Sequence, residues 1–150
     1  MRLRALALAC IAAWLGIGAF FSLVVAPLVF RTVDRAPAGQ AVSAVLPHYY
    51  AWGVVLVAVA LVSYVVLGLR RDGGRWGHVV AAALCGTVLA GLLWAWLIVL
   101  PQAETARRSR ADTAFARAHR RAVQLNGLSL AAGAAVLVLE VLRRGPRRSR

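Results

Sequence analysis

Polar side chains recur along one face of the last apolar segment of the chain, with one glycine among them. The members of this stripe are His119, Asn126, Ser129, Gly133 and Glu140. At about 3.6 residues per helical turn, their spacing places them on roughly one face of a helix. Ionisable groups inside a membrane are costly and usually face a bundle interior, a water-filled cavity or a partner. The stripe therefore predicts either hydrogen bonds between helices, with Glu140 reaching the interface, or a polar path or ligand site.

A second set of residues that could do chemistry lies where apolar segments begin or end. The stretch "VVAPLVFR" closes the first segment, "LPHYY" opens the second and "LPQAE" closes the third. If consecutive segments cross a membrane in alternating directions, these residues and the start of the fourth segment share one side. The candidate ligand-binding residues of this polar mouth are Arg31, Tyr50, Glu104, His119 and Asn126. Arg31 would contact an anion, and His119 would act as a ligand or proton carrier.

Histidine and carboxylate side chains at the mouth raise the alternative of a metal or haem site. His48, His119 and Glu104 are of types that bind transition metals, and the two histidines could ligate haem iron from both sides. They lack HxxxH or HxxH spacing, so a structural role or contact with anionic headgroups competes with this interpretation. Haem or a transition metal is the cofactor alternative, and the cofactor is otherwise unknown.

Motifs typical of catalysis are not visible in the sequence. There is no evident pair of nucleophile and base, and "RRDGGRWG" lacks the strand context of a dinucleotide fingerprint. Cys10 and Cys85 lie inside apolar runs without CxxC spacing, which defines neither a disulfide framework nor a zinc motif. The pattern does not favour an enzyme.

The composition places the elements that carry these residues in a lipid bilayer. Hydrophobic residues make up 61% of the 150 residues, and the mean hydropathy is +0.73. Soluble domains contain about 45–50% apolar residues. All 18 basic residues are arginine, against five acidic residues, for a net charge of +13. These arginines crowd at the ends of apolar runs, which favours contact with anionic headgroups over nucleic-acid binding.

Four charge-free runs predict an all-α membrane protein with four transmembrane helices. The spans cover about residues 5–30, 49–69, 78–100 and 122–139, within a single domain 1–150 that has a basic tail at 143–150. Backbone groups in lipid must be satisfied within each segment, so the helices should form an antiparallel bundle with both termini on the same side. The last helix could also begin early, near Ala111. Arginine counts near the helix ends favour cytoplasmic termini in a bacterial inner membrane.

Proline and small residues supply expectations about helix shape and packing. Pro27 removes one backbone donor and can kink the first helix. Small residues four apart allow helices to approach closely, within the bundle or, as the alternative, at a homodimer face. These residues are Ala12 and Gly16, Ala82 and Gly86, and the series Gly127, Ala131 and Ala135.

The stretches "FFSLVVAPLVFR", "AG" at Ala38–Gly39, "LPHYY", the proline that ends the third span and "FARAHRRAVQLNGLSL" together resemble an uncharacterised bacterial membrane family. It is domain of unknown function 4149, which is similar to the animal transmembrane protein 205 group, and the resemblance runs from about Leu6 to Leu139. It implies structural roles for Pro27, Pro47, Pro101 and Gly39. The remaining matching positions are Phe30, Arg31, Tyr50, Phe115, His119 and Asn126. The animal relatives are associated with resistance to platinum drugs.

The sequence therefore predicts an integral membrane protein whose polar mouth binds or passes a small ligand, a metal ion or a lipid headgroup. Two alternatives stay open: an accessory subunit packed against a larger membrane complex, and a haem-dependent oxidoreductase. The expected partners are a bilayer with anionic headgroups and either a second copy of the chain or a larger membrane complex.

Overall fold

The computed structural model describes residues 2–70 and 75–143, and these residues form helices and short turns with no strand among them. The elements are α1 (Arg2–Phe20), η1 (Phe21–Val25), α2 (Ala26–Thr32), α3 (Arg35–Leu69), α4 (Arg75–Trp94), η2 (Ala95–Val99), α5 (Leu100–Arg108) and α6 (Asp112–Leu142). Because α1, η1 and α2 are continuous, as are α4, η2 and α5, the described chain contains four long helices. All four are long and apolar enough to cross a membrane.

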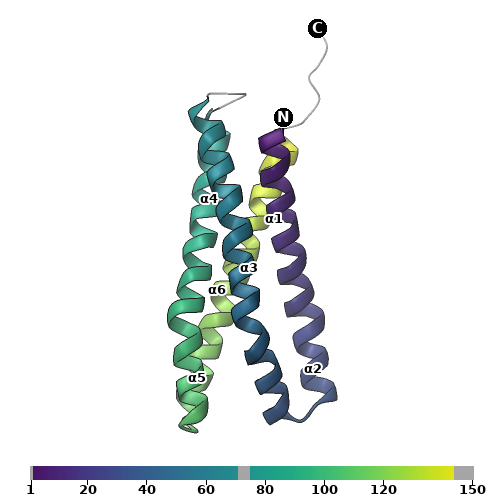
Figure 1. The fold of residues 1–150 in the computed structure, drawn as a ribbon, viewed down its shortest axis with the longest axis vertical. Helices are drawn as coiled ribbons and strands as arrows, with labels where there is room; N and C mark the ends of the chain where they lie inside the picture. Colours follow the sequence, from purple (N-terminus) through teal and green to yellow (C-terminus); the bar gives the residue numbers. More distant parts are fainter. Residues whose placement is uncertain (1, 71–74, 144–150) are drawn as a thin grey trace.

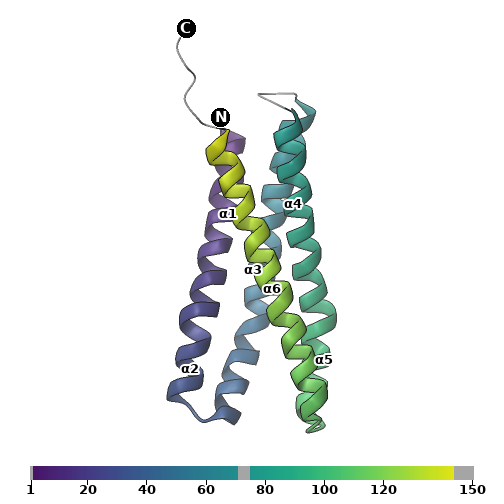
Figure 2. The same ribbon diagram turned by 180° about the vertical axis from the view of Figure 1, so that it is seen from behind.

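The helices form an elongated antiparallel bundle (Figures 1 and 2). Helix α1 packs against α3 and α6, and α4 packs against the same two helices from the other side. Helix α1 begins and α6 ends at one end of the bundle, which we call the terminal end. The opposite end holds α2, the start of α3 and the turn between α5 and α6, and we call it the mouth end. The predicted fold class, with both helical termini on the same side, is confirmed.

The helices are longer than the predicted spans. Helix α3 begins at Arg35 rather than near residue 49, so the expected first loop reduces to Val33 and Asp34. Charged residues end a charge-free run without ending the helix. Pro37 lies in the first turn of α3, where a missing N–H donor is tolerated. Helix α6 begins at Asp112, as the early-start alternative expected. A helix of 31 residues is about 46 Å long, which exceeds the roughly 30 Å hydrocarbon core.

Two prolines near the mouth end are each preceded by a π-helical turn. Pro27 follows η1, in which the Ala26 N–H donates to the Phe21 carbonyl. Pro101 follows η2, in which the Leu100 N–H donates to the Ala95 carbonyl. Proline cannot donate to the carbonyl four residues earlier, and the wider turn relieves the clash of its ring with that carbonyl. The kink expected at Pro27 is therefore accommodated as a local widening of the helix.

The middle of the bundle is apolar and closely packed around Trp14. The Trp14 side chain has no exposed surface. A Cβ atom added at Gly53 would lie 2.9 Å from Trp14 Nε1, and one at Gly133 would lie 2.7 Å from Trp14 Cζ3. Helices α3 and α6 therefore need glycine at these positions to pack against the indole ring.

The small-residue pairs that the sequence singled out do not make the helix contacts expected of them. Ala12 and Gly16 on α1 are exposed, as are Gly127, Ala131 and Ala135 on α6. A Cβ atom added at Gly16 or Gly127 would meet nothing within 4 Å. Their expected packing inside the bundle is wrong, because the close approaches occur at other glycines, and the homodimer face stays a prediction. Ala82 and Gly86 are half-buried.

Candidate functional site

The five predicted mouth residues come from four different elements. Arg31 lies on α2, Tyr50 on α3 and Glu104 on α5, whereas His119 and Asn126 lie on α6. The side chains of Arg31 and His119 are exposed, whereas Tyr50 is 4% exposed. In the described part of the chain, no hydrogen bond or ion pair joins any two of these five residues. The structure therefore shows no direct polar contact among them, and their joint role in one site stays a prediction.

Asn126 instead connects three helices through a hydrogen-bonded cluster. The Tyr49 hydroxyl donates to Asn126 Oδ1 at 2.6 Å, and Asn126 Nδ2 donates to Ser22 Oγ at 3.0 Å. The ring of Phe21 stacks on that of Tyr49 with centroids 5.2 Å apart, and Tyr50 meets Tyr49 edge-on at 5.3 Å. Tyr49 is 6% exposed, so this cluster links helices inside the bundle.

Ser22 and Tyr49 were missed as members of this cluster, because the sequence does not show which face of the first helix turns inward. Both lie in or beside regular apolar runs. The π-helical turn η1 contains an extra residue per turn, which rotates the helix face after it by roughly 100°. Phe21 and Ser22, at the start of this turn, are both half-buried, and both contact the Tyr49–Asn126 pair.

His119 lies on a different face of α6 from the one predicted. The stripe pattern placed it inward, but the buried residues of α6 are Ala118, Ser129, Gly133, Val136 and Glu140. Helix α5 packs against the first turns of α6, and this contact buries the small Ala106 and Ala118 side chains. His119 is exposed and stacks on Phe115 with centroids 6.1 Å apart. The inward stripe is right for Asn126, which is half-buried, and for the buried residues that follow it.

The predicted metal ligands lie on three different helices: His48 on α3, Glu104 on α5 and His119 on α6. Glu104 accepts hydrogen bonds from Arg107 at 3.0 and 2.8 Å and from Arg108 at 2.8 Å. His48 is exposed on α3. Within the ranges that the structure covers, no three His, Cys, Asp or Glu side chains are grouped to hold a metal ion. A metal or haem at the mouth stays a prediction that these contacts do not support.

The residues with predicted structural roles lie along the mouth half of the bundle. Pro27 and Pro101 open α2 and α5 after their π-helical turns. Pro47 lies inside α3, where its ring removes one backbone donor without ending the helix. Gly39 also lies in α3, and a Cβ atom there would meet nothing within 4 Å. Close packing therefore does not require glycine at that position.

A cleft of about 260 Å³ opens between α5 and α6 at the mouth end. It is lined by Gln102, Ala114, Arg117, Ala118 and Arg121. Arg117 Nε donates to the Thr113 carbonyl at 3.4 Å, and neither cleft arginine forms an ion pair with another described residue. Arg117 and Arg121 are one helical turn apart, so their guanidinium groups lie on the same side of α6. The cleft is therefore lined by two positively charged groups, one amide group and two small alanine side chains.

The terminal end contains a second polar cluster, which is built around Glu140. This carboxylate is 1% exposed and accepts hydrogen bonds from Arg4 Nε and, at 3.0 Å, from Arg143 Nη1. Arg143 also lies 3.2 Å from His78 Nδ1. A Cβ atom at Gly77 would lie 2.5 Å from Arg143 Cζ, so glycine admits the guanidinium group beside α4. The cluster ties α1, α4 and α6 together, and His78 is buried within it.

These features define an all-α membrane protein with four long helices, a polar cluster around Asn126 inside the bundle and another around Glu140 at the terminal end. The chain belongs to the family described as Domain of unknown function (DUF4149), whose family model matches residues 9–112. The family expected from the sequence is therefore confirmed. Three positions assigned by resemblance, Phe115, His119 and Asn126, lie beyond the matched range.

One relative gives a partial match to the chain. An "Uncharacterized protein" of Aquifex aeolicus (strain VF5) is 41% identical over 70 residues, which cover 47% of this chain and 48% of the relative. The match thus spans about half the length of this curated relative. No solved structure matches the chain. These comparisons identify a bacterial relative and a family without assigning an activity.

Proposed function

We propose that this integral membrane protein binds a phosphate-bearing anion at its mouth end, in the cleft between α5 and α6. The observation that carries the proposal is the pair of arginines, Arg117 and Arg121, which line the cleft together with Gln102. Ligand binding at the mouth was predicted from the sequence. The proposed residues differ, because Arg31 and Glu104 do not line this cleft.

The charges around the cleft favour an anion over a metal ion. Glu104 is the carboxylate on α5, and its oxygens already accept hydrogen bonds from Arg107 and Arg108. No carboxylate lines the cleft itself. Guanidinium groups offer N–H donors in a fixed fork that matches phosphate oxygens, and the Gln102 amide can supply a further donor. The small Ala114 and Ala118 side chains leave room for the anion between the two helices.

The hydrogen-bonded cluster at Asn126 has a supporting role in this proposal. It lies further along α6 from the cleft and joins α6 to α3 and to η1. Tyr49 and Ser22 each form a hydrogen bond with Asn126, so these side chains hold α6 in position rather than contact the anion. This arrangement keeps Arg117 and Arg121 on a fixed helix beside α5.

We further propose that both termini lie in the cytoplasm of a bacterial inner membrane. Arginine counts near the span ends are slightly higher on the terminal side, in keeping with the positive-inside rule. The relative in Aquifex aeolicus is bacterial. In this orientation the α5–α6 cleft opens on the side opposite the cytoplasm.

The test is a titration of the purified full chain, in an uncharged detergent, with inorganic phosphate and separately with short-chain phosphatidylglycerol. Isothermal calorimetry should show saturable binding that weakens as salt is added. The double variant Arg117→Gln, Arg121→Gln should bind at least about tenfold more weakly, since each lost charge-assisted hydrogen bond contributes about 1.5–3 kcal/mol. Arg120→Gln is the matched control, because Arg120 is exposed on α6 but does not line the cleft.

The two ligands distinguish the source of the anion. Tighter binding of phosphate indicates a soluble ligand. Tighter binding of phosphatidylglycerol that is weakened in the double variant indicates a lipid headgroup. Absence of saturable binding to either ligand contradicts the proposal, as does equal affinity in wild type and double variant. The same purified sample tests the two alternatives: a Soret absorbance band would support the haem oxidoreductase, and a stoichiometric co-purifying complex would support the accessory subunit.

A further inference from the structure

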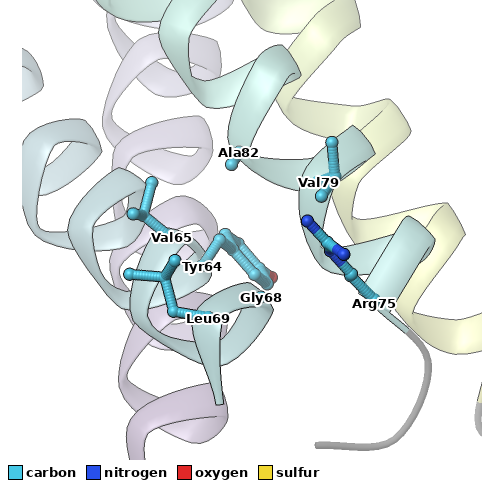
Figure 3. Close-up of a pocket in the computed structure, with 7 residues that line it drawn as sticks. All are labelled: Tyr64, Val65, Gly68, Leu69, Arg75, Val79 and Ala82. Atoms are coloured by element: carbon cyan, nitrogen blue, oxygen red, sulfur yellow. The ribbon is translucent and has the colours of Figure 1, made fainter. Parts of the chain in front are cut away.

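A groove at the terminal end of the bundle, between the end of α3 and the start of α4, is separate from the proposed anion cleft. Its volume is about 340 Å³. Figure 3 shows Val65 and Leu69 on the α3 side and Val79 on the α4 side, with the Arg75 guanidinium extending from the α4 side toward the space. The walls are therefore apolar along most of the groove, with one positive group near its end.

Arg75 marks the depth of the groove in the bilayer. It is exposed in the first turn of α4 and forms no ion pair with any other residue that the structure describes. Its neighbour Trp76 is 81% exposed. Exposed tryptophan and arginine at the end of a membrane helix lie at the level of the lipid headgroups. The apolar walls extend from this level into the hydrocarbon region, since Val79 and Ala82 follow along α4.

The ring of Tyr64 lies at the base of the groove. Its side chain has no exposed surface, and the ring stacks on His78 with centroids 6.3 Å apart. Because the hydroxyl group is buried inside the bundle, a ligand in the groove meets the apolar ring rather than the hydroxyl. Beside Tyr64, Gly68 lines the groove without a side chain.

We propose that this groove binds an anionic glycerophospholipid. The acyl chain lies along Val65, Leu69 and Val79, and the phosphate pairs with Arg75. Each part of the lipid meets a complementary group: the hydrocarbon meets apolar walls, and the negative charge meets an arginine that forms no ion pair with another described residue. The groove is at the opposite end of the bundle from the α5–α6 cleft, so this site does not rest on the proposed function.

The experiment compares lipid retention by the full chain in detergent, measured by native mass spectrometry. Phosphatidylglycerol and phosphatidylcholine with identical acyl chains are added at equal concentration. The wild type should retain phosphatidylglycerol about tenfold better, which corresponds to one charge-assisted contact. Arg75→Gln should remove this preference. Val79→Trp, which fills the groove, should lower retention of both lipids.

Two controls distinguish specific lipid binding in the groove from nonspecific attraction to surface charge and from misfolding of the variants. Arg70→Gln removes an exposed arginine at the same end of the bundle that does not line the groove, and it should leave the preference unchanged. All three variants should keep the wild-type helical circular dichroism and phosphate affinity. Equal retention of the two lipids by the wild type overturns the proposal. It is also overturned if Arg70→Gln and Arg75→Gln reduce the preference equally, or if Val79→Trp retains lipid as the wild type does.

Discussion

Asn126 shows how one residue of the polar stripe acts within the bundle. Its amide group accepts from the Tyr49 hydroxyl and donates to Ser22, so three helices share one side chain. In lipid, helices lack a hydrophobic drive to associate, and hydrogen bonds between them contribute to packing. The role of Asn126 in this structure is therefore to hold α6 against α3 and η1.

Replacing Asn126 by alanine should destabilise the bundle by about 1–2 kcal/mol, because the Tyr49 and Ser22 hydroxyls lose their shared partner. Thermal unfolding in detergent measures the effect. Gln124→Ala is the control, since Gln124 is exposed on the same helix. Equal melting temperatures for Asn126→Ala and Gln124→Ala would show that the hydrogen-bonded cluster does not stabilise the bundle.

The two glutamates of the described helices should respond differently to the same substitution. Glu140→Gln leaves Arg4 and Arg143 without their buried counter-charge and should cost about 3–5 kcal/mol. Glu104→Gln removes more exposed ion pairs, which contribute about 0–1 kcal/mol. Denaturation of both variants under the same conditions measures the difference. A larger loss of stability for Glu104→Gln than for Glu140→Gln would contradict the conclusion that the buried Glu140 cluster holds the helices together.

Periodicity could predict some members of the candidate site and not others. The inward direction of Glu140 follows from helical spacing along one regular helix, and the direction of Asn126 follows from the same pattern. The partners Ser22 and Arg4 lie more than a hundred residues earlier in the chain, and no pattern within one helix selects them. The predicted inward direction of His119 is wrong for a local reason. Helix α5 packs against Ala118 at the start of α6, and this contact determines which face of α6 is buried.

At the scale of elements, the sequence predicts where helices cross the membrane better than where they end. Charge-free runs locate all four spans, because burying charge in hydrocarbon is costly. The helices continue past these runs as far as Arg108 at the end of α5, because arginine is a good helix former outside the bilayer core. Helix length is therefore set by backbone propensity and turns, and the spans are set by side-chain charge.

Glycine positions on α6 give a direct test of how the elements pack. Gly133→Ala places a Cβ atom 2.7 Å from the fully buried Trp14 ring and should cost about 1–3 kcal/mol. Gly127→Ala, on the same helix, meets nothing within 4 Å and should leave stability unchanged or raise it by up to about 1 kcal/mol. Unfolding in detergent measures both. A larger loss of stability for Gly127→Ala than for Gly133→Ala would contradict the close packing of α6 against Trp14.

At the scale of the whole molecule, the four-helix topology places both ends of the described chain on one side of the membrane. Single cysteines introduced at Arg2 and at Arg70 should both react with a membrane-impermeant maleimide that is added on one side of the membrane. A single cysteine at Ser109 should react only when the maleimide is on the opposite side. The native Cys10 and Cys85 are buried, which limits background labelling. In intact cells, cytoplasmic termini predict labelling at position 109 alone. Labelling of positions 2 and 109 from the same side would contradict the bundle topology.

The charge of the molecule gives the proposed function its most direct test. The chain carries a net charge of +13, so weak attraction of anions to many arginines is expected, and a site must be distinguished from this background. The decisive measurement is the affinity for inorganic phosphate of Arg117→Gln, Arg121→Gln beside that of Arg31→Gln, in one detergent and at one ionic strength. The cleft variant should lose about tenfold or more in phosphate affinity, whereas Arg31→Gln should keep the wild-type affinity. Loss of binding on changing Arg31, with the cleft variant unaffected, would contradict it.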